Sequence, residues 1–173
     1  MLPSMTFVLG GAASGKSQVA ESLIVNSGLR PVYLATARVW DAEVQTKVDL
    51  HRARRAAEWT VIDAPVDLAT PLGQARADQA ILLDCATMWL TNVMLDAADI
   101  GQAQAGLLTS LATCAAPVVV VSNAVGQGIV PDNALARRFR EAQGRLNIAL
   151  AAQADCVLFV VAGLVQTLKG DAP

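Results

Sequence analysis

Short apolar runs alternate with longer stretches of helical periodicity along this chain of 173 residues. Several of the runs are continuously apolar, which is typical of strands buried on both faces of a parallel sheet. The pattern predicts strands at residues 6–9, 32–35, 59–62, 80–84, 118–122 and 157–161. It predicts helices at residues 17–27 and 41–54, in a stretch after Thr87, near 102–114, and at 133–153.

The helix at 133–153 has the clearest pattern. Its start is marked by Pro131 and Asp132. Five residues recur at helical spacing and are expected to form its buried face: Leu135, Phe139, Ala142, Leu146 and Ala149. Its arginines are expected to form a solvated face: Arg137, Arg138, Arg140 and Arg145.

One loop carries the strongest chemical signal. It fits the phosphate-binding pattern G-x-x-x-x-G-K-[ST] with Gly10, Gly11, Ala12, Ala13, Ser14, Gly15, Lys16 and Ser17. Between a strand and a helix, such a loop surrounds phosphates with backbone N–H groups. Lys16 is expected to reach the β- and γ-phosphates, and the Ser17 hydroxyl to bind Mg²⁺. A glycine-rich turn with a surface lysine is the alternative, but it does not explain why four motif positions coincide.

The loop and the alternating elements together predict a fold. They favour a single P-loop NTPase-type α/β domain over residues 1–173. Its sheet is expected to be mostly parallel, with helices on both faces and right-handed crossovers. The hydrophobic fraction of 54% supplies a full core for one such domain.

Composition excludes several partners and locations. A net charge of −2 gives no electrostatic footprint for nucleic acid. The longest apolar run, 156–165, is about half the length of a bilayer helix, so no membrane span is expected. No basic residue precedes the first apolar stretch, so we expect no signal peptide and a cytoplasmic protein. Without C-x-x-C spacing, Cys85, Cys114 and Cys156 are expected to be small buried hydrophobes.

Asp84 ends the apolar run 81–84 and has the form of a Walker B carboxylate. In a P-loop fold, that carboxylate helps to hold Mg²⁺ opposite the loop serine. A strand-end cap of the next turn is the alternative. The segment 122–131, which contains two glycines and Pro131, either lines the cleft at the strand ends or simply connects two elements.

His51 is the only histidine, and it lies near the end of the predicted helix 41–54. The neighbouring Arg52, Arg54 and Arg55 favour the neutral form of its ring and attract a triphosphate. A neutral imidazole can attack phosphorus and form a covalent intermediate. The alternative is a histidine that interacts only with the helix dipole or with solvent.

These regions, taken in order, resemble the bifunctional adenosylcobinamide kinase/adenosylcobinamide-phosphate guanylyltransferase family of cobalamin biosynthesis. The resemblance covers nearly the whole chain. Beyond the generic P-loop, its most specific motifs are His51-Arg52 and the segment Gly128-Ile129-Val130-Pro131. Further matches lie at residues 33–36, 41–43, 82–85, 91–92, 123–126, 135–137, 144–147, 160–163 and 168–169.

The resemblance implies two reactions on a corrinoid substrate. ATP or GTP phosphorylates the hydroxyl of the aminopropanol arm of adenosylcobinamide, and GMP is then transferred from GTP to that phosphate with release of pyrophosphate. It implies catalytic roles for His51, as the GMP carrier, and for Lys16, with Mg²⁺ held by Ser17 and Asp84. It also implies a homo-oligomer. The guanine-nucleotide contacts of the family map onto the loop 10–17 and onto Ala35, Thr36, Ala37, Arg52, Ala53, Arg54, Arg55, Asp63 and Asp84.

The chain departs from the family pattern at several positions. Ala13, Ala56 and Ala124 stand where arginine, proline and glutamate are usual, and Asp63 and Asp84 replace glutamates. The change at Ala124 removes a carboxylate that could act as base or metal partner. Two rival functions also fit the residues alone: a P-loop small-molecule kinase without a covalent intermediate, and a non-catalytic nucleotide-binding regulatory module. The missing N-K-x-D motif argues against a guanine-nucleotide switch.

Overall fold

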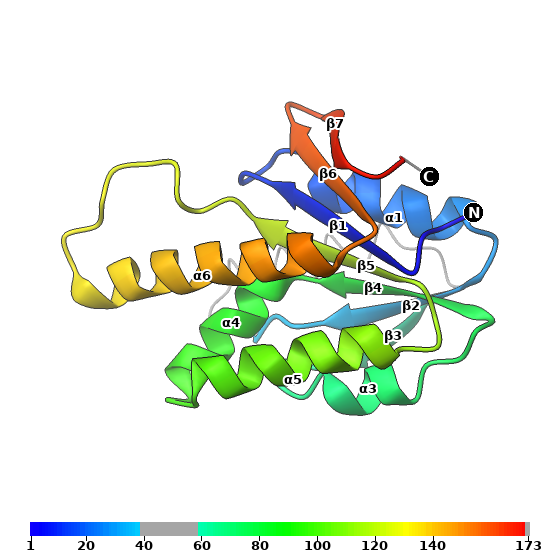
Figure 1. The fold of residues 1–173 in the computed structure, drawn as a ribbon, viewed down its shortest axis with the longest axis horizontal. Coiled ribbons are helices and arrows are strands. Elements are labelled where there is room, and N and C mark those ends of the chain that lie inside the picture. The colour runs from blue at the N-terminus through cyan, green and yellow to red at the C-terminus, as the bar shows by residue number, and fades with distance from the viewer. Residues whose placement is uncertain (39–58, 172–173) are drawn as a thin grey trace.

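The computed structural model describes residues 1–38 and 59–171, which build a seven-stranded sheet with helices on both faces (Figure 1). The strand order is β3-β2-β4-β5-β1-β6-β7, and only β7 is antiparallel to its neighbour. The expected α/β fold with a mostly parallel sheet is confirmed. The elements are β1 (Met5–Gly10), α1 (Lys16–Asn26), β2 (Arg30–Ala35), β3 (Thr60–Asp63), α3 (Ala69–Gly73), β4 (Gln79–Asp84), α4 (Ala86–Leu95), α5 (Ile100–Thr113), β5 (Val118–Asn123), α6 (Ala134–Gln153), β6 (Cys156–Val161) and β7 (Leu164–Lys169).

Alternate residues along the strands point to opposite faces of the sheet. In β1, Phe7 packs into the cluster that contains α3, α4, α5 and α6, whereas Val8 packs into the cluster that contains α1. Both side chains are fully buried. Two buried faces explain why the sequence shows continuous apolar runs where a one-sided sheet would show alternation.

Two elements were not predicted. β7 follows β6 through the two-residue turn Ala162-Gly163, which lacks the Asn-Gly or Asp-Gly pair that usually marks such a hairpin. α3 has only five residues and contains Pro71, so it is too short to show a helical period. The predicted helix 41–54 lies outside the described residues.

The expected buried face of α6 was partly wrong. Leu135 is 54% exposed, and Gln143 is fully buried instead. The first turns of α6 extend beyond the ends of the strands, so no core lies beneath them (Figure 1). The full set of buried α6 residues is Ala142, Gln143, Leu146 and Leu150.

Two of the arginines expected on a solvated face have a structural role. Arg137 donates hydrogen bonds from Nη1 to the carbonyls of Pro131 at 3.0 Å and Asp132 at 2.6 Å. Arg140 donates from Nη2 to the carbonyls of Gly126 and Gly128. The guanidiniums therefore attach the loop between β5 and α6 to the helix that follows it.

The turn between β6 and β7 contains a residue in an unfavourable conformation. Ala162 has φ of +51° and Gly163 has φ of +79°, as in a type I′ hairpin turn. Asparagine tolerates a positive φ better than alanine. We therefore expect Ala162→Asn to raise the free energy of unfolding by about 0.5–1 kcal/mol, and the melting temperature by about 1–4 °C. Thermal denaturation followed by circular dichroism measures this. Ala162→Val, with a β-branched side chain at the same φ, should lower the melting temperature, and an equal shift for both variants would contradict the argument.

Candidate functional site

The loop between β1 and α1 has the backbone of a phosphate-binding loop. Gly10 has no room for a side chain, because a Cβ there would lie 2.5 Å from Ser14 Oγ and 2.7 Å from the Val160 carbonyl oxygen. Gly15 stands at the N-cap of α1 with φ of +93°, a left-handed conformation that favours glycine. The backbone path therefore requires both glycines.

Lys16 opens α1, and its side chain folds back over the loop. Its Nζ donates a hydrogen bond to the Gly11 carbonyl at 3.0 Å. This contact keeps the ammonium group beside the N-terminus of α1, where the helix dipole also favours an anion. Ser17 follows in the first helical turn, as the motif requires.

Backbone hydrogen bonds attach the loop on both sides of β1. The Gly163 N–H, in the β6–β7 turn, donates to the Ser14 carbonyl at 2.8 Å. The Ala124 N–H, just after β5, donates to the Gly10 carbonyl at 3.0 Å. The strands on either side of β1 thus hold the loop at its first residue and near its last.

Asp84 is the last residue of β4. It lies at the edge of the sheet where the carboxyl ends of the parallel strands meet, which is also the edge that carries the phosphate-binding loop. Its Oδ2 accepts a hydrogen bond from the Tyr33 hydroxyl at 3.2 Å. Burial, and then the Asp84 carboxylate, raise the pKa of the Cys85 thiol to about 12, while the charge of Lys16 acts in the opposite direction. Lys16 and Asp84 therefore both act on one buried thiol. That thiol stays protonated near neutral pH and cannot serve as a nucleophile.

The other cysteines are not candidates either. Burial raises the pKa of the Cys114 and Cys156 thiols above the ordinary value. The expectation of burial is confirmed for Cys85 and Cys156, whereas Cys114 is half-buried.

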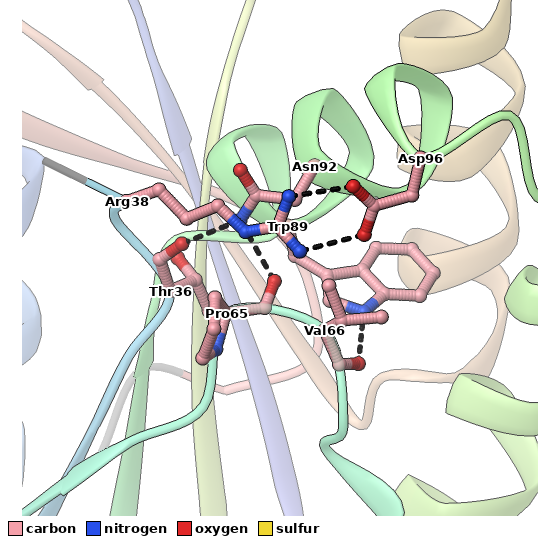
Figure 2. Close-up of polar contacts among 7 residues, drawn as sticks. All are labelled: Thr36, Arg38, Pro65, Val66, Trp89, Asn92 and Asp96. Carbon is pink, nitrogen blue, oxygen red and sulfur yellow. Dashed lines mark hydrogen bonds and ion pairs between the residues drawn. The ribbon is translucent and has the colours of Figure 1, made fainter. Parts of the chain in front are cut away.

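Hydrogen bonds fix the exit of β2 to neighbouring elements. The Thr36 hydroxyl accepts from the Cys85 N–H at 2.7 Å and donates to the Cys85 carbonyl at 2.8 Å. Asn92, buried on α4, donates from Nδ2 to the carbonyls of Thr36 and Pro65, each at 2.8 Å (Figure 2). The predicted contact residues 35–37 therefore have a defined path.

A surface ion pair extends this attachment. Arg38 donates to both carboxylate oxygens of Asp96, which follows α4, at 2.7 and 2.6 Å (Figure 2). The hydrogen bonds from Arg38 lower the pKa of the Asp96 carboxyl group. Bidentate geometry fixes orientation as well as distance. The segment that follows β2 is thus attached to α4 at Asn92 and, just after the helix, at Asp96.

The predicted site residues of the strands lie at one edge of the sheet, since β1 to β4 run parallel. Ala35 pairs with Asp63 on one side and with Asp84 on the other, so these three residues form a row. Asp63 is exposed on the outer strand β3, four strand spacings from β1, or roughly 19 Å. The loop 10–17 follows β1, which lies two strand spacings beyond Asp84 on the side away from Asp63. The predicted residues His51, Arg52, Ala53, Arg54 and Arg55, and the departure at Ala56, lie outside the described residues.

Oxygen donors at this edge suit magnesium. Mg²⁺ in nucleotide sites is held by one or two carboxylates, a P-loop hydroxyl and substrate phosphates. The Ser17 hydroxyl and the Asp84 carboxylate match that donor set. Within residues 1–38 and 59–171, no three His, Cys, Asp or Glu side chains gather to form a protein-only metal site.

A buried polar network behind β5 was missed in the sequence. Gln143 donates from Nε2 to the Ser122 hydroxyl at 3.0 Å, and Ser122 donates to Asn147 Oδ1 at 2.7 Å. The Asn123 N–H donates to the Thr87 hydroxyl at 2.9 Å. The network joins α4 and α6 to the strand beside β1. Its signal in the sequence is Gln143, a polar residue on the buried face of an otherwise amphipathic helix.

The chain is similar to one protein family and to several curated proteins. Residues 6–168 match the family model of cobinamide kinase / cobinamide phosphate guanyltransferase. A bifunctional adenosylcobalamin biosynthesis protein, CobP of Pseudomonas aeruginosa, is 41% identical over 167 residues, which cover 95% of this chain and 96% of that protein. The protein of the same description from Salmonella typhimurium, CobU, is 38% identical over 181 residues, covering 95% of this chain and 99% of that protein.

Solved structures share the fold at low sequence identity. The flagellar accessory protein FlaH from Methanocaldococcus jannaschii has a TM-score of 0.52 and 11% identity, with 99% of this chain and 80% of that chain covered. A protein from Pyrococcus horikoshii OT3 has a TM-score of 0.55 and 10% identity, with 99% and 89% covered. No helix in the described ranges has both the length and the hydropathy needed to cross a membrane.

Proposed function

The chain belongs to the cobinamide kinase / cobinamide phosphate guanyltransferase family, and on that premise we propose that it catalyses both reactions in cobalamin biosynthesis. It phosphorylates adenosylcobinamide with ATP or GTP, then transfers GMP from GTP to the new phosphate. The observation that carries the proposal is the P-loop fixed between β1 and α1, with the Asp84 carboxylate at the same edge.

The kinase step uses the loop. The backbone N–H groups of residues 11–16 and the Lys16 ammonium would hold the β- and γ-phosphates. The substrate hydroxyl oxygen attacks the γ-phosphorus and gives up its proton to solvent, the bond from that phosphorus to the β–γ bridging oxygen breaks, and the nucleoside diphosphate leaves. Mg²⁺ bound by Ser17 and Asp84 would neutralise part of the charge on the phosphates. Tyr33, which donates to Asp84 Oδ2, keeps that carboxylate oriented.

The guanylyl step would use His51. A ring nitrogen of neutral His51 attacks the α-phosphorus of GTP, a nitrogen–phosphorus bond forms, and pyrophosphate leaves with the electrons of the broken P–O bond. A phosphate oxygen of adenosylcobinamide phosphate then attacks the same phosphorus and releases the imidazole. Arg52 and Arg55 would neutralise the triphosphate. Because burial keeps the Cys85 thiol protonated near neutral pH, that thiol would not compete with His51 for the α-phosphorus.

A product assay tests the proposed function. The purified chain is incubated with adenosylcobinamide, Mg²⁺ and either ATP alone or GTP, and the corrinoids are separated by chromatography. With ATP alone we expect adenosylcobinamide phosphate to accumulate. With GTP we expect adenosylcobinamide-GDP and pyrophosphate in equal amounts. Phosphorylation without any guanylylated product would reduce the function to a simple kinase, and binding of nucleotide without either product would leave only a nucleotide-binding module.

A further inference from the structure

An apolar hollow lies between α4 and α6. It encloses about 280 Å³. Among the described residues, two polar side chains line it, Thr91 and Asn133, and no charged side chain does. The apolar lining consists of Met94, Leu95, Leu135, Ala136 and Phe139.

The mouth of the hollow is unusually apolar for a protein surface. Leu95 is 53% exposed and Leu135 is 54% exposed, although both are large hydrophobic residues. Ile129 and Val130, also exposed, lie in the loop that leads to Asn133. Leu95 and Leu135 both line the hollow, and exposed apolar residues that gather in this way are typical of binding surfaces. Arg140 holds this loop through the carbonyls of Gly126 and Gly128, so the surface has a fixed support.

A short series of contacts connects the hollow to the phosphate-binding loop. Thr91, in the lining, donates from its hydroxyl to the Thr87 carbonyl at 2.9 Å, one turn earlier on α4. The Thr87 hydroxyl accepts from the Asn123 N–H at 2.9 Å. Asn123 is the register partner of Gly10, the first residue of the loop. The hollow is therefore separated from the P-loop by one helical turn, one hydrogen bond between α4 and β5, and one strand spacing.

Two other hollows in the described residues suit the corrinoid less well. One, of about 520 Å³, is lined by Arg30, Thr60 and Gln79 at the amino ends of β2, β3 and β4, on the wrong edge of the sheet for transfer from the P-loop. The other, of about 350 Å³, lies beside the outer strand β3 and contains Arg38 and Asp63. Its charged lining suits a polar ligand better than an apolar ring.

We propose that the hollow between α4 and α6 receives an apolar edge of the corrin ring of adenosylcobinamide; this inference rests on the proposed function. The edge of the corrin ring carries methyl groups between uncharged amide side chains, which matches an uncharged, mostly apolar lining with one hydroxyl and one amide at Thr91 and Asn133. Ligand pockets for whole molecules are usually 300–1,000 Å³. A volume of about 280 Å³ therefore suits one edge of the ring. The aminopropanol arm would extend from that edge across β5 to the loop.

The substitution Ala136→Glu tests this proposal without weakening the helix. Ala136 lines the hollow and stands three residues after the N-cap Asn133. A glutamate at this position is favourable in a helix, through the capping box and the helix dipole. The same side chain puts volume and charge into the hollow. We expect KM for adenosylcobinamide to rise at least about tenfold in the kinase reaction, with KM for ATP unchanged.

Ile148→Glu is the matched control. Ile148 lies on the same helix and is 72% exposed, and it does not line the hollow. The KM of the Ile148→Glu variant for adenosylcobinamide should equal that of the unmodified chain. An Ala136→Glu variant with unchanged KM would overturn the proposal. A second outcome would also overturn it. If size-exclusion chromatography shows that Ala136→Glu, but not Ile148→Glu, dissociates an oligomer, the hollow is a contact between copies of the chain. Failure of the proposed function itself is distinguishable, since the unmodified chain would then phosphorylate no adenosylcobinamide.

Discussion

Replacing Lys16 with alanine is expected to reduce both the kinase and the guanylyltransferase reaction by on the order of 10²–10³-fold in kcat. The Lys16 ammonium lies at the loop, bonded to the Gly11 carbonyl, and it is the described cation nearest to the expected phosphate position. Charge develops on the transferring phosphoryl group and on the leaving pyrophosphate, and a fixed cation stabilises both. Steady-state assays of both products measure the loss.

Lys16→Arg is the matched control for that prediction. It keeps the charge but replaces a compact ammonium with a planar guanidinium, which does not fit the same hydrogen bond to Gly11. We expect part of the affinity for nucleotide to return, but little of the turnover. A folded Lys16→Ala variant with full turnover in both reactions would refute the assignment of residues 10–17 as the phosphate site.

Replacing His51 with alanine is expected to abolish guanylyl transfer, by on the order of 10⁴-fold or more, and to spare phosphorylation. In the proposed mechanism only the second reaction passes through a bond to the imidazole, whereas the first depends on the loop. With GTP labelled at the α-phosphate, the unmodified chain should retain label that is lost in acid and survives base, as a phosphoramidate does. The His51→Ala chain should retain none.

Cys85→Ser separates the two possible carriers of the label. Burial holds the pKa of the Cys85 thiol at about 12, so its removal should leave the labelled species in place. Label that persists in a folded His51→Ala chain would contradict the role of the histidine. Equal loss of both activities in that chain would contradict separate roles for the loop and the imidazole.

The sequence predicted those parts of the fold whose signals are local. Gly10 and Gly15 are required by close contacts and by a positive φ, respectively, and such requirements leave a fixed pattern along the chain. The buried strands were visible because both of their faces lie in the core. Asp84 was visible because it ends one of these runs.

Other parts depend on contacts between distant segments. Nothing near Gly163 in the sequence indicates that its N–H supports Ser14, because the contact exists only once β6 lies beside β1. The role of Arg140 was misjudged for a similar reason, since its acceptors are carbonyls of a loop whose path the sequence does not show. Leu135 fits a helical period, but no core lies beneath the start of α6.

The position of β1 between β5 and β6 has a consequence for synthesis on the ribosome. The residues of the loop 10–17 are translated well before their neighbours in the sheet, since both strands that flank β1 begin after residue 117. The bonds from Ala124 and Gly163 to the loop cannot form until those late segments have left the exit tunnel. Until those segments are made, the nascent chain carries an apolar strand with both edges unpaired, a state that is prone to wrong pairing. The loop should reach the conformation described above only after β5 and the β6–β7 hairpin have folded beside β1.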